Sequence, residues 1–160
     1  MLRILNSVNN AISKAFEVLL LVMFSTMVIS CFLQVVTRLA GSPLPWSEEL
    51  SRYMAVYLTF LGACYGYRKG GLITVEIAIS RLTGHKKTAL LTFITAVTIA
   101  FCFVMIRYGF AIVTRFMGQT SPALHIPMGL VYAVAPICGV SMILVAVEQL
   151  AMQFKLSKEA

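Results

Sequence analysis

Four long apolar stretches alternate with shorter polar segments along the chain, and this pattern predicts a helical membrane protein. The stretches cover residues 18–36, 46–67, 88–107 and 126–147. A transmembrane helix needs about 20 residues, because each residue advances the helix by about 1.5 Å. We therefore expect an all-α fold of four transmembrane helices. These helices use most of residues 1–160, so we expect a single membrane domain and no soluble one.

Two segments outside these stretches carry a mixed apolar and polar pattern. Residues 1–16 repeat apolar positions at near-helical spacing, which predicts an amphipathic helix on the cytoplasmic surface. Residues 70–86 fit two periods, a strand period at Ile73, Val75, Ile77 and Ile79 and a helical one at Leu72, Val75, Ile79 and Leu82. Because a lone strand at a membrane leaves its backbone unpaired, we expect a short amphipathic helix here as well.

Composition and charge support this interpretation and give the orientation. The chain is 59% hydrophobic and 12% charged, whereas soluble domains carry about 25% charged residues. With the N-terminus inside, nine basic residues face the cytoplasm, namely Arg3, Lys14, Arg68, Lys69, Arg81, Lys86, Lys87, Lys155 and Lys158, and three face outside, namely Arg38, Arg107 and Arg115. This bias predicts that both termini are cytoplasmic. The net charge of +7 thus reflects membrane topology and is not taken as a nucleic-acid signal.

Charged residues stand at the start of the second stretch. Ser47 is positioned to cap a helix, Glu48 and Glu49 fall in its first turn, and Arg52 follows on the same face. Together with Arg38 and Arg107, these side chains predict a polar cluster at the outer face that binds a partner. The alternative is ordinary helix capping, with separate side chains reaching the interface.

Three further features concern helix packing. Gly62 and Gly66 form a small-residue pattern that lets another helix approach closely, either from this chain or from a partner. Trp46 is an expected anchor at the membrane interface. Pro136 lies inside the fourth stretch, where it lacks a backbone N–H, so we expect a kink.

The residues for catalysis or metal binding are sparse. The chain has no Asp, and none of its six Glu residues lies at the centre of an apolar stretch, where a proton-coupled carrier usually has one. His85 and His125 are expected on opposite sides of the membrane. Each stretch holds one cysteine, and we expect Cys64 and Cys102 to lie about 15–20 Å apart in depth. The sequence therefore predicts no catalytic residue, metal site or cofactor in this chain.

Several motifs resemble the small membrane subunit of tripartite ATP-independent periplasmic (TRAP) transporters, the DctQ-like family. The most specific is Trp46-Ser47-Glu48-Glu49-Leu50-Ser51-Arg52-Tyr53. Further similarity lies at Arg38, Leu61-Gly62-Ala63, Arg68, Ser121-Pro122-Ala123-Leu124, Pro127, Tyr132 and Pro136. The chain departs from the pattern at Leu72, where family members often have His, so a role that depends on that His is not expected.

The resemblance implies a multi-pass protein of the bacterial inner membrane that assembles with a large multi-span subunit. It implies uptake of an organic acid, such as a dicarboxylate or a sugar acid, delivered by a periplasmic binding protein and driven by sodium ions bound in the large subunit. The small subunit would then be a scaffold within the lipid membrane. Two alternatives stay open on the residues alone: a small transporter that works by itself as an oligomer, and an electron-transfer membrane subunit.

Overall fold

The regular structure of the described residues is helical throughout. The computed structural model describes residues 2–69 and 85–159. Its helices are α1 (Leu2–Leu39), α2 (Pro45–Arg68), α4 (His85–Phe116), α5 (Met128–Tyr132) and α6 (Val134–Glu159). Within these ranges there is no strand, and extended pairing is limited to one bridge between Thr120 and Pro127. The predicted all-α class is therefore confirmed for the described part of the chain.

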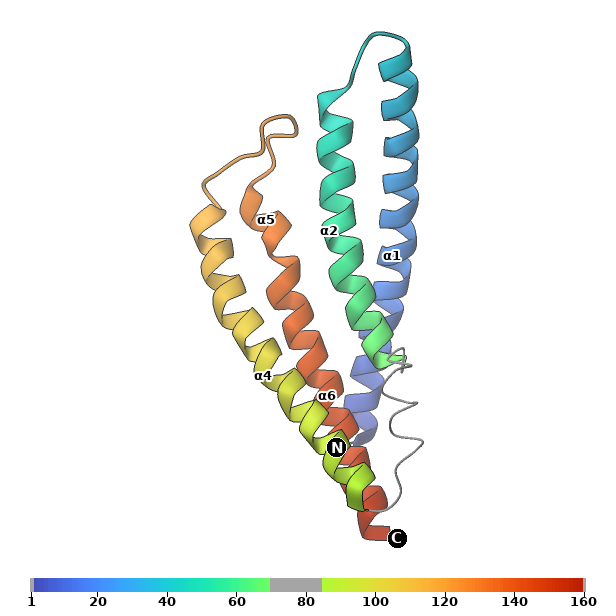
Figure 1. Cartoon of the computed structure of the whole chain (residues 1–160), viewed down its shortest axis with the longest axis vertical. Helices are drawn as coiled ribbons and strands as arrows, with labels where there is room; N and C mark the ends of the chain where they lie inside the picture. The colour runs from blue at the N-terminus through green and yellow to red at the C-terminus, as the bar shows by residue number, and fades with distance from the viewer. Residues whose placement is uncertain (1, 70–84, 160) are drawn as a thin grey trace.

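The helices form two antiparallel hairpins, α1 with α2 and α4 with α5 and α6 (Figure 1). The hairpins are joined mainly by α6, which contacts both α2 and α1, whereas the backbone of α4 stays apart from both in the described residues. Side chains bridge part of this gap, since Tyr67 of α2 and Ile99 of α4 belong to one apolar cluster. In Figure 1 the hairpins are close together where α1 begins and α6 ends, and they separate toward the opposite end. We call these the narrow end and the wide end. The wide end carries the 40–44 turn and the 117–127 connector.

The buried core is small and lies where the two hairpins meet. Leu61 and Cys64 of α2 pack against Val134 and Cys138 of α6, with partly buried residues of α1 around them. Many other large apolar side chains point outward, including Leu21, Phe32 and Phe103, which are 65%, 70% and 66% exposed. Such an apolar exterior fits a lipid environment, where exposed apolar side chains carry no hydration cost.

Three helical stretches of the described residues are long and apolar enough to cross a membrane: Asn6–Leu39, Ala89–Phe116 and Met128–Ala151. They correspond to the predicted first, third and fourth spans. Helix α2 matches the predicted second span in position but is less apolar, since Glu48, Glu49 and Arg52 lie in its first two turns. The assignment of α2 as a fourth transmembrane helix is therefore a proposal.

The expected surface helix at residues 1–16 is not a separate element. Residues 2–39 form one continuous helix, because this part of the sequence contains neither Gly nor Pro to interrupt it. The polar residues among 6–10 also do not all face solvent, since Asn9 is buried against α6. Of the second surface helix expected at 70–86, residues 70–84 lie outside the described residues, and His85 begins α4.

The third helix is longer than predicted. Residues 108–116, expected to start an outer connector, are the last turns of α4. Arg107 was taken as the helix end, but it is an exposed residue well inside α4. Gly109 does not break the helix either. It allows α6 to approach closely, since a Cβ there would lie 3.0 Å from Cδ of Pro136.

The helix is interrupted before Pro136, and the predicted kink itself stays a prediction. The fourth stretch divides into α5 and α6 at Ala133, three residues before the proline. Pro136 has no N–H to donate to the carbonyl of Tyr132, so the regular ladder cannot pass this point. The Ala133 N–H makes the regular bond to the Gly129 carbonyl oxygen at 3.0 Å and shares it with the Leu130 carbonyl oxygen at 3.2 Å, so only the bond to Tyr132 is lost.

The expected depth difference between Cys64 and Cys102 is wrong. The Cys64 thiol lies 3.5 Å from the carbonyl oxygen of Cys138, and a Cβ at neighbouring Gly139 would lie 3.3 Å from the carbonyl oxygen of Cys102. All three cysteines are therefore at one level. The estimate failed because α4 continues to Phe116, so Cys102 lies near the middle of its helix.

Candidate scaffold and partner-binding sites

The predicted Ser47 cap is wrong, and the serine instead joins α1 to α2. Helix α2 begins at Pro45, whose fixed φ and missing N–H suit the first helical position, and Leu44 is the capping residue. The Ser47 hydroxyl donates to the Leu44 carbonyl at 2.8 Å, while its own carbonyl accepts from Ser30 of α1 at 2.9 Å. Ser30 and Ser47 are 3% and 0% exposed, so this contact is buried in the hairpin.

The neighbouring carboxylates Glu48 and Glu49 have different partners. Glu48 forms an ion pair with Arg52 at 3.0 Å, and both side chains are well exposed, at 62% and 70%. Glu49 is half-buried and accepts hydrogen bonds from the backbone N–H groups of Ala123 and Leu124, both at 2.9 Å. Glu49 therefore fixes the tip of the 117–127 connector onto the start of α2.

The connector is itself an ordered loop. The Ser121 N–H donates to the Ile126 carbonyl at 2.9 Å, and the Met128 N–H donates to Gln119 at 2.8 Å. The buried Ser121 hydroxyl accepts from the Ile126 N–H, and His125 takes a positive φ of 56° that closes the turn. This loop turns the N–H groups of residues 123 and 124 toward the Glu49 carboxylate.

Two tyrosines of α2 complete this wide-end contact. The Tyr53 hydroxyl donates to Glu49 and lies 3.3 Å from the sulfur of Met128. One turn further, the Tyr57 hydroxyl donates to the Leu130 carbonyl at 2.6 Å. Both link the first hairpin to the second, at the end where the helix ribbons lie apart (Figure 1).

The predicted outer cluster is only partly assembled. The described residues show one ion pair there, between Glu48 and Arg52. Arg38 and Arg107 are exposed and pair with neither carboxylate within the described part of the chain. Arg107 is too far from the end of α4 to reach the group, because that helix extends to Phe116.

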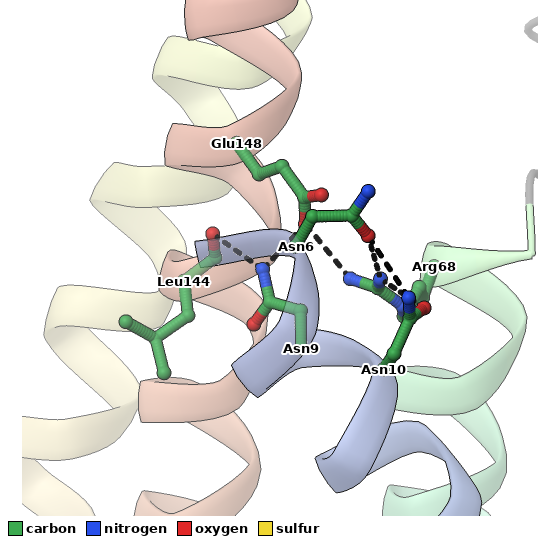
Figure 2. A network of polar contacts seen from close by, with 6 residues as sticks. All are labelled: Asn6, Asn9, Asn10, Arg68, Leu144 and Glu148. Atoms are coloured by element: carbon green, nitrogen blue, oxygen red, sulfur yellow. Dashed lines mark hydrogen bonds and ion pairs between the residues drawn. The ribbon is translucent and has the colours of Figure 1, made fainter. Parts of the chain in front are cut away.

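A second polar network, which the sequence analysis missed, joins three helices at the narrow end (Figure 2). Arg68 at the end of α2 forms an ion pair with Glu148 of α6 at 2.8 Å, and their side chains are only 13% and 6% exposed. The same guanidinium donates to Asn10 and Asn6 of α1, at 2.7 and 3.3 Å. The buried Asn9 amide donates to Glu148 and to the Leu144 carbonyl.

Little in the sequence indicated that these residues interact. Asn9 and Glu148 are 139 positions apart, and neither position by itself indicates the other as its partner. The available clue was the spacing of Asn6, Asn9 and Asn10, which places three amides on neighbouring faces of α1. Together with Arg68 and Glu148, they satisfy one another's hydrogen-bonding groups, with Asn9 and Glu148 buried and Asn10 at the exposed edge.

The small-residue face of α2 meets no other part of the described chain. A Cβ at Gly62 or at Gly66 would have no neighbouring atom within 4 Å. Gly66 lines an apolar groove of about 510 Å³ between α2 and α4, with Tyr67, Phe101 and Met142 among its walls. Close helix approach within the chain occurs instead at Gly109, Gly129 and Gly139. Trp46 is exposed at the start of α2, as an interfacial anchor requires.

The described residues contain no group of three or more His, Cys, Asp or Glu side chains that could hold a metal ion. The polar contacts fix helices and a loop relative to one another, and the exterior is apolar over three long helices. The fold and these contacts define an integral membrane protein.

Comparison with known proteins gives the family. Residues 27–156 match the family described as "Tripartite ATP-independent periplasmic transporters, DctQ component", and the chain belongs to this family. It is similar to a Haemophilus influenzae protein provisionally named TRAP transporter small permease protein, with 30% identity over 138 residues, 85% of each chain. It is also similar to the C4-dicarboxylate TRAP transporter small permease protein DctQ of Rhodobacter capsulatus, with 30% identity over 102 residues, 62% of this chain and 45% of that protein.

The predicted resemblance is thereby confirmed: the chain is a small permease subunit of a TRAP transporter. Such a subunit is a transporter component and not an enzyme. The roles predicted for Arg38, Trp46, Glu48, Glu49, Arg52, Gly62 and Gly66 in binding a partner remain predictions.

Proposed function

We propose that this chain is a scaffold that holds a large multi-span subunit and carries no substrate itself. The complete transporter would import an organic acid, such as a dicarboxylate or a sugar acid, delivered by a periplasmic binding protein. Sodium ions bound in the large subunit would drive uptake. This chain would bind no cofactor and contribute a rigid wall to the complex.

The observation that carries the proposal is the open face of α2. Gly62 and Gly66 have free space beside them, and the groove next to Gly66 is lined mainly by apolar atoms. Small residues on a membrane helix allow another helix to approach closely. Because the backbones of α2 and α4 stay apart beside this groove in the described residues, a helix from the large subunit has access to this face.

The distribution of buried charge agrees with a scaffold. Glu148 is the charged side chain among the most buried residues of the described part, and it lies at the narrow end, paired with Arg68. A carrier usually places ionisable groups or broken half-helices near the membrane midplane. Here the ion pair joins α2 to α6, and the Glu148 carboxylate is occupied by Arg68 and is not available to a coupling ion.

The proposed topology has four transmembrane helices, both termini in the cytoplasm and one domain in the bacterial inner membrane. Helix α2 has 24 residues, enough to cross the hydrocarbon core, and α1 begins at the end of the molecule where α6 ends (Figure 1). Single cysteines in a cysteine-free variant test this. Position 85 should stay unlabelled by a membrane-impermeant reagent in intact cells, and labelling there would contradict the orientation.

Reconstitution tests the function. Liposomes with the large subunit, the binding protein and a sodium gradient should take up substrate only when this chain is present. Uptake by this chain alone would favour a small oligomeric transporter that works by itself. Full uptake without this chain would contradict the scaffold role.

A further inference from the structure

A polar cavity lies beside the narrow-end network. It has a volume of about 550 Å³ and is walled by α1, the end of α2 and α6. This volume is within the range of about 300–1,000 Å³ usual for small-ligand sites. Arg68, Glu148 and Asn10 form one wall and are already bonded to one another (Figure 2), so that wall is preorganised.

The free hydrogen-bonding groups of the cavity are predominantly donors. Its two carboxylates are engaged, Glu148 by Arg68 and Glu17 by the Tyr65 hydroxyl at 3.2 Å. Lys14 and the side chains of Ser13 and Gln149 have no hydrogen bond or ion pair with any described residue. The Lys69 ammonium only lies over the Tyr65 ring, 5.6 Å from its centre. The cavity has three basic and two acidic side chains, so it carries one positive charge in excess, which favours an anion.

We propose that this cavity binds the phosphate of an anionic phospholipid headgroup, with Lys14 and Lys69 as charged contacts and Ser13 and Gln149 as hydrogen-bond donors. Basic residues near the membrane surface attract anionic lipid, at roughly 1 kcal/mol for each Lys or Arg, and basic pockets between helices bind lipid headgroups. The site is separate from the open face of α2 and does not depend on the scaffold proposal.

The surroundings of the cavity select a lipid over free phosphate. One turn after Lys14, α1 presents outward-facing apolar side chains, with Val18, Leu21 and Val22 at 61%, 65% and 58% exposed. A lipid whose headgroup enters the cavity can lay its acyl chains along this surface. Free phosphate would lose these apolar contacts and hence most of the expected affinity.

Native mass spectrometry of the full chain, delipidated in detergent and titrated with phosphatidylglycerol or phosphatidylcholine, tests the proposal. We expect preferential retention of phosphatidylglycerol. In the Lys14→Gln, Lys69→Gln variant its affinity should fall about tenfold or more. Arg115→Gln removes one positive charge at the other end of the molecule and should leave the affinity unchanged.

Three results would overturn the proposal: equal affinity for the two lipids, unchanged affinity in the double variant, or an equal loss in Arg115→Gln. Thermal denaturation controls for folding, and if the double variant melts early, Lys14→Gln alone is used, because Lys14 is exposed. In the final measurement, inorganic phosphate is added as a competitor of phosphatidylglycerol. If it displaces phosphatidylglycerol at equal concentration, the site is a phosphate site and the lipid assignment is wrong.

Discussion

Adjacent glutamates at the start of α2 contribute unequally to stability. Glu48 forms an exposed pair with Arg52, and such pairs contribute only about 0–1 kcal/mol. Glu49 accepts two backbone N–H groups of a loop more than 70 positions away. Hydrogen bonds to a charged acceptor are stronger, at about 1.5–3 kcal/mol each. The loop contact therefore depends on Glu49 and not on Glu48.

Replacing Glu49 by Gln should loosen the connector, since a neutral amide oxygen accepts the two loop N–H groups less strongly than the carboxylate and the amide NH2 cannot accept from Tyr53. We expect faster amide hydrogen exchange at residues 123 and 124 and a loss of about 1–3 kcal/mol in unfolding free energy. Glu48→Gln is the matched control and should change either quantity little. Equal exchange rates in the two variants would show that Glu49 does not hold the loop.

The Arg68–Glu148 pair gives a second test at the residue scale. Glu148→Gln leaves the Arg68 charge largely buried without its counter-ion, so the unfolding free energy in detergent should fall by about 3–5 kcal/mol. Adding Arg68→Gln to that variant should recover part of the loss, because the unpaired charge is removed. A double variant that loses the sum of both single effects would argue against direct coupling.

These residue contacts show which parts of the site could not be predicted from the sequence. The stretch around Glu48 and Glu49 was identified as important because charge at the start of an apolar helix is unusual. Its main partner was not identified, since backbone N–H groups leave no trace in the sequence. Arg107 was placed in the cluster on the assumption that α4 ends near residue 107, which the structure contradicts.

At the scale of helices, glycine positions distinguish contacts within the chain from contacts left open. Gly129 lies so close to α4 that a Cβ would be 2.8 Å from the carbonyl oxygen of Val113. Gly139 similarly approaches Ile106, at 2.9 Å. Gly62 has open space beside it, although its sequence pattern is the better-known helix-packing signal. The sequence identified a packing face, and the structure shows that this chain does not use it internally.

Alanine substitutions test this distinction. Gly129→Ala should destabilise the isolated chain by about 1–3 kcal/mol, because the new methyl group meets backbone that cannot move easily. Gly62→Ala should be neutral or stabilising by up to about 1 kcal/mol, since alanine favours a helix and meets no neighbour. Thermal denaturation of both variants in one detergent gives the comparison. A larger loss for Gly62→Ala would contradict the assigned packing.

The helix pattern was predictable to different degrees along the chain. The existence of the long apolar helices follows from hydrophobicity, and the break before Pro136 follows from its missing N–H. Helix ends were predicted poorly where polar side chains were taken as boundaries, as at residues 16 and 107. A membrane-length criterion stops at about 20 residues, whereas α1 and α4 extend to 38 and 32.

At the scale of the whole molecule, two hairpins are joined strongly at the narrow end and by a loop contact at the wide end. Arg68, Glu148 and the α1 asparagines join three helices at the first, and Glu49 with Tyr53 and Tyr57 joins the hairpins at the second. Between them, the backbones of α2 and α4 stay apart in the described residues, although Tyr67 and Ile99 share one apolar cluster. This arrangement gives a rigid frame with one open apolar side, as the scaffold proposal requires.

Co-purification of the large subunit with this chain tests the scaffold account most directly. Gly62→Leu places a bulky side chain on the open face of α2, and Ala15→Leu makes a comparable change on an exposed position of α1. Both variants should melt like the unchanged chain when purified alone. The account predicts that Gly62→Leu loses most of the bound large subunit while Ala15→Leu retains it, and full retention by Gly62→Leu would contradict it.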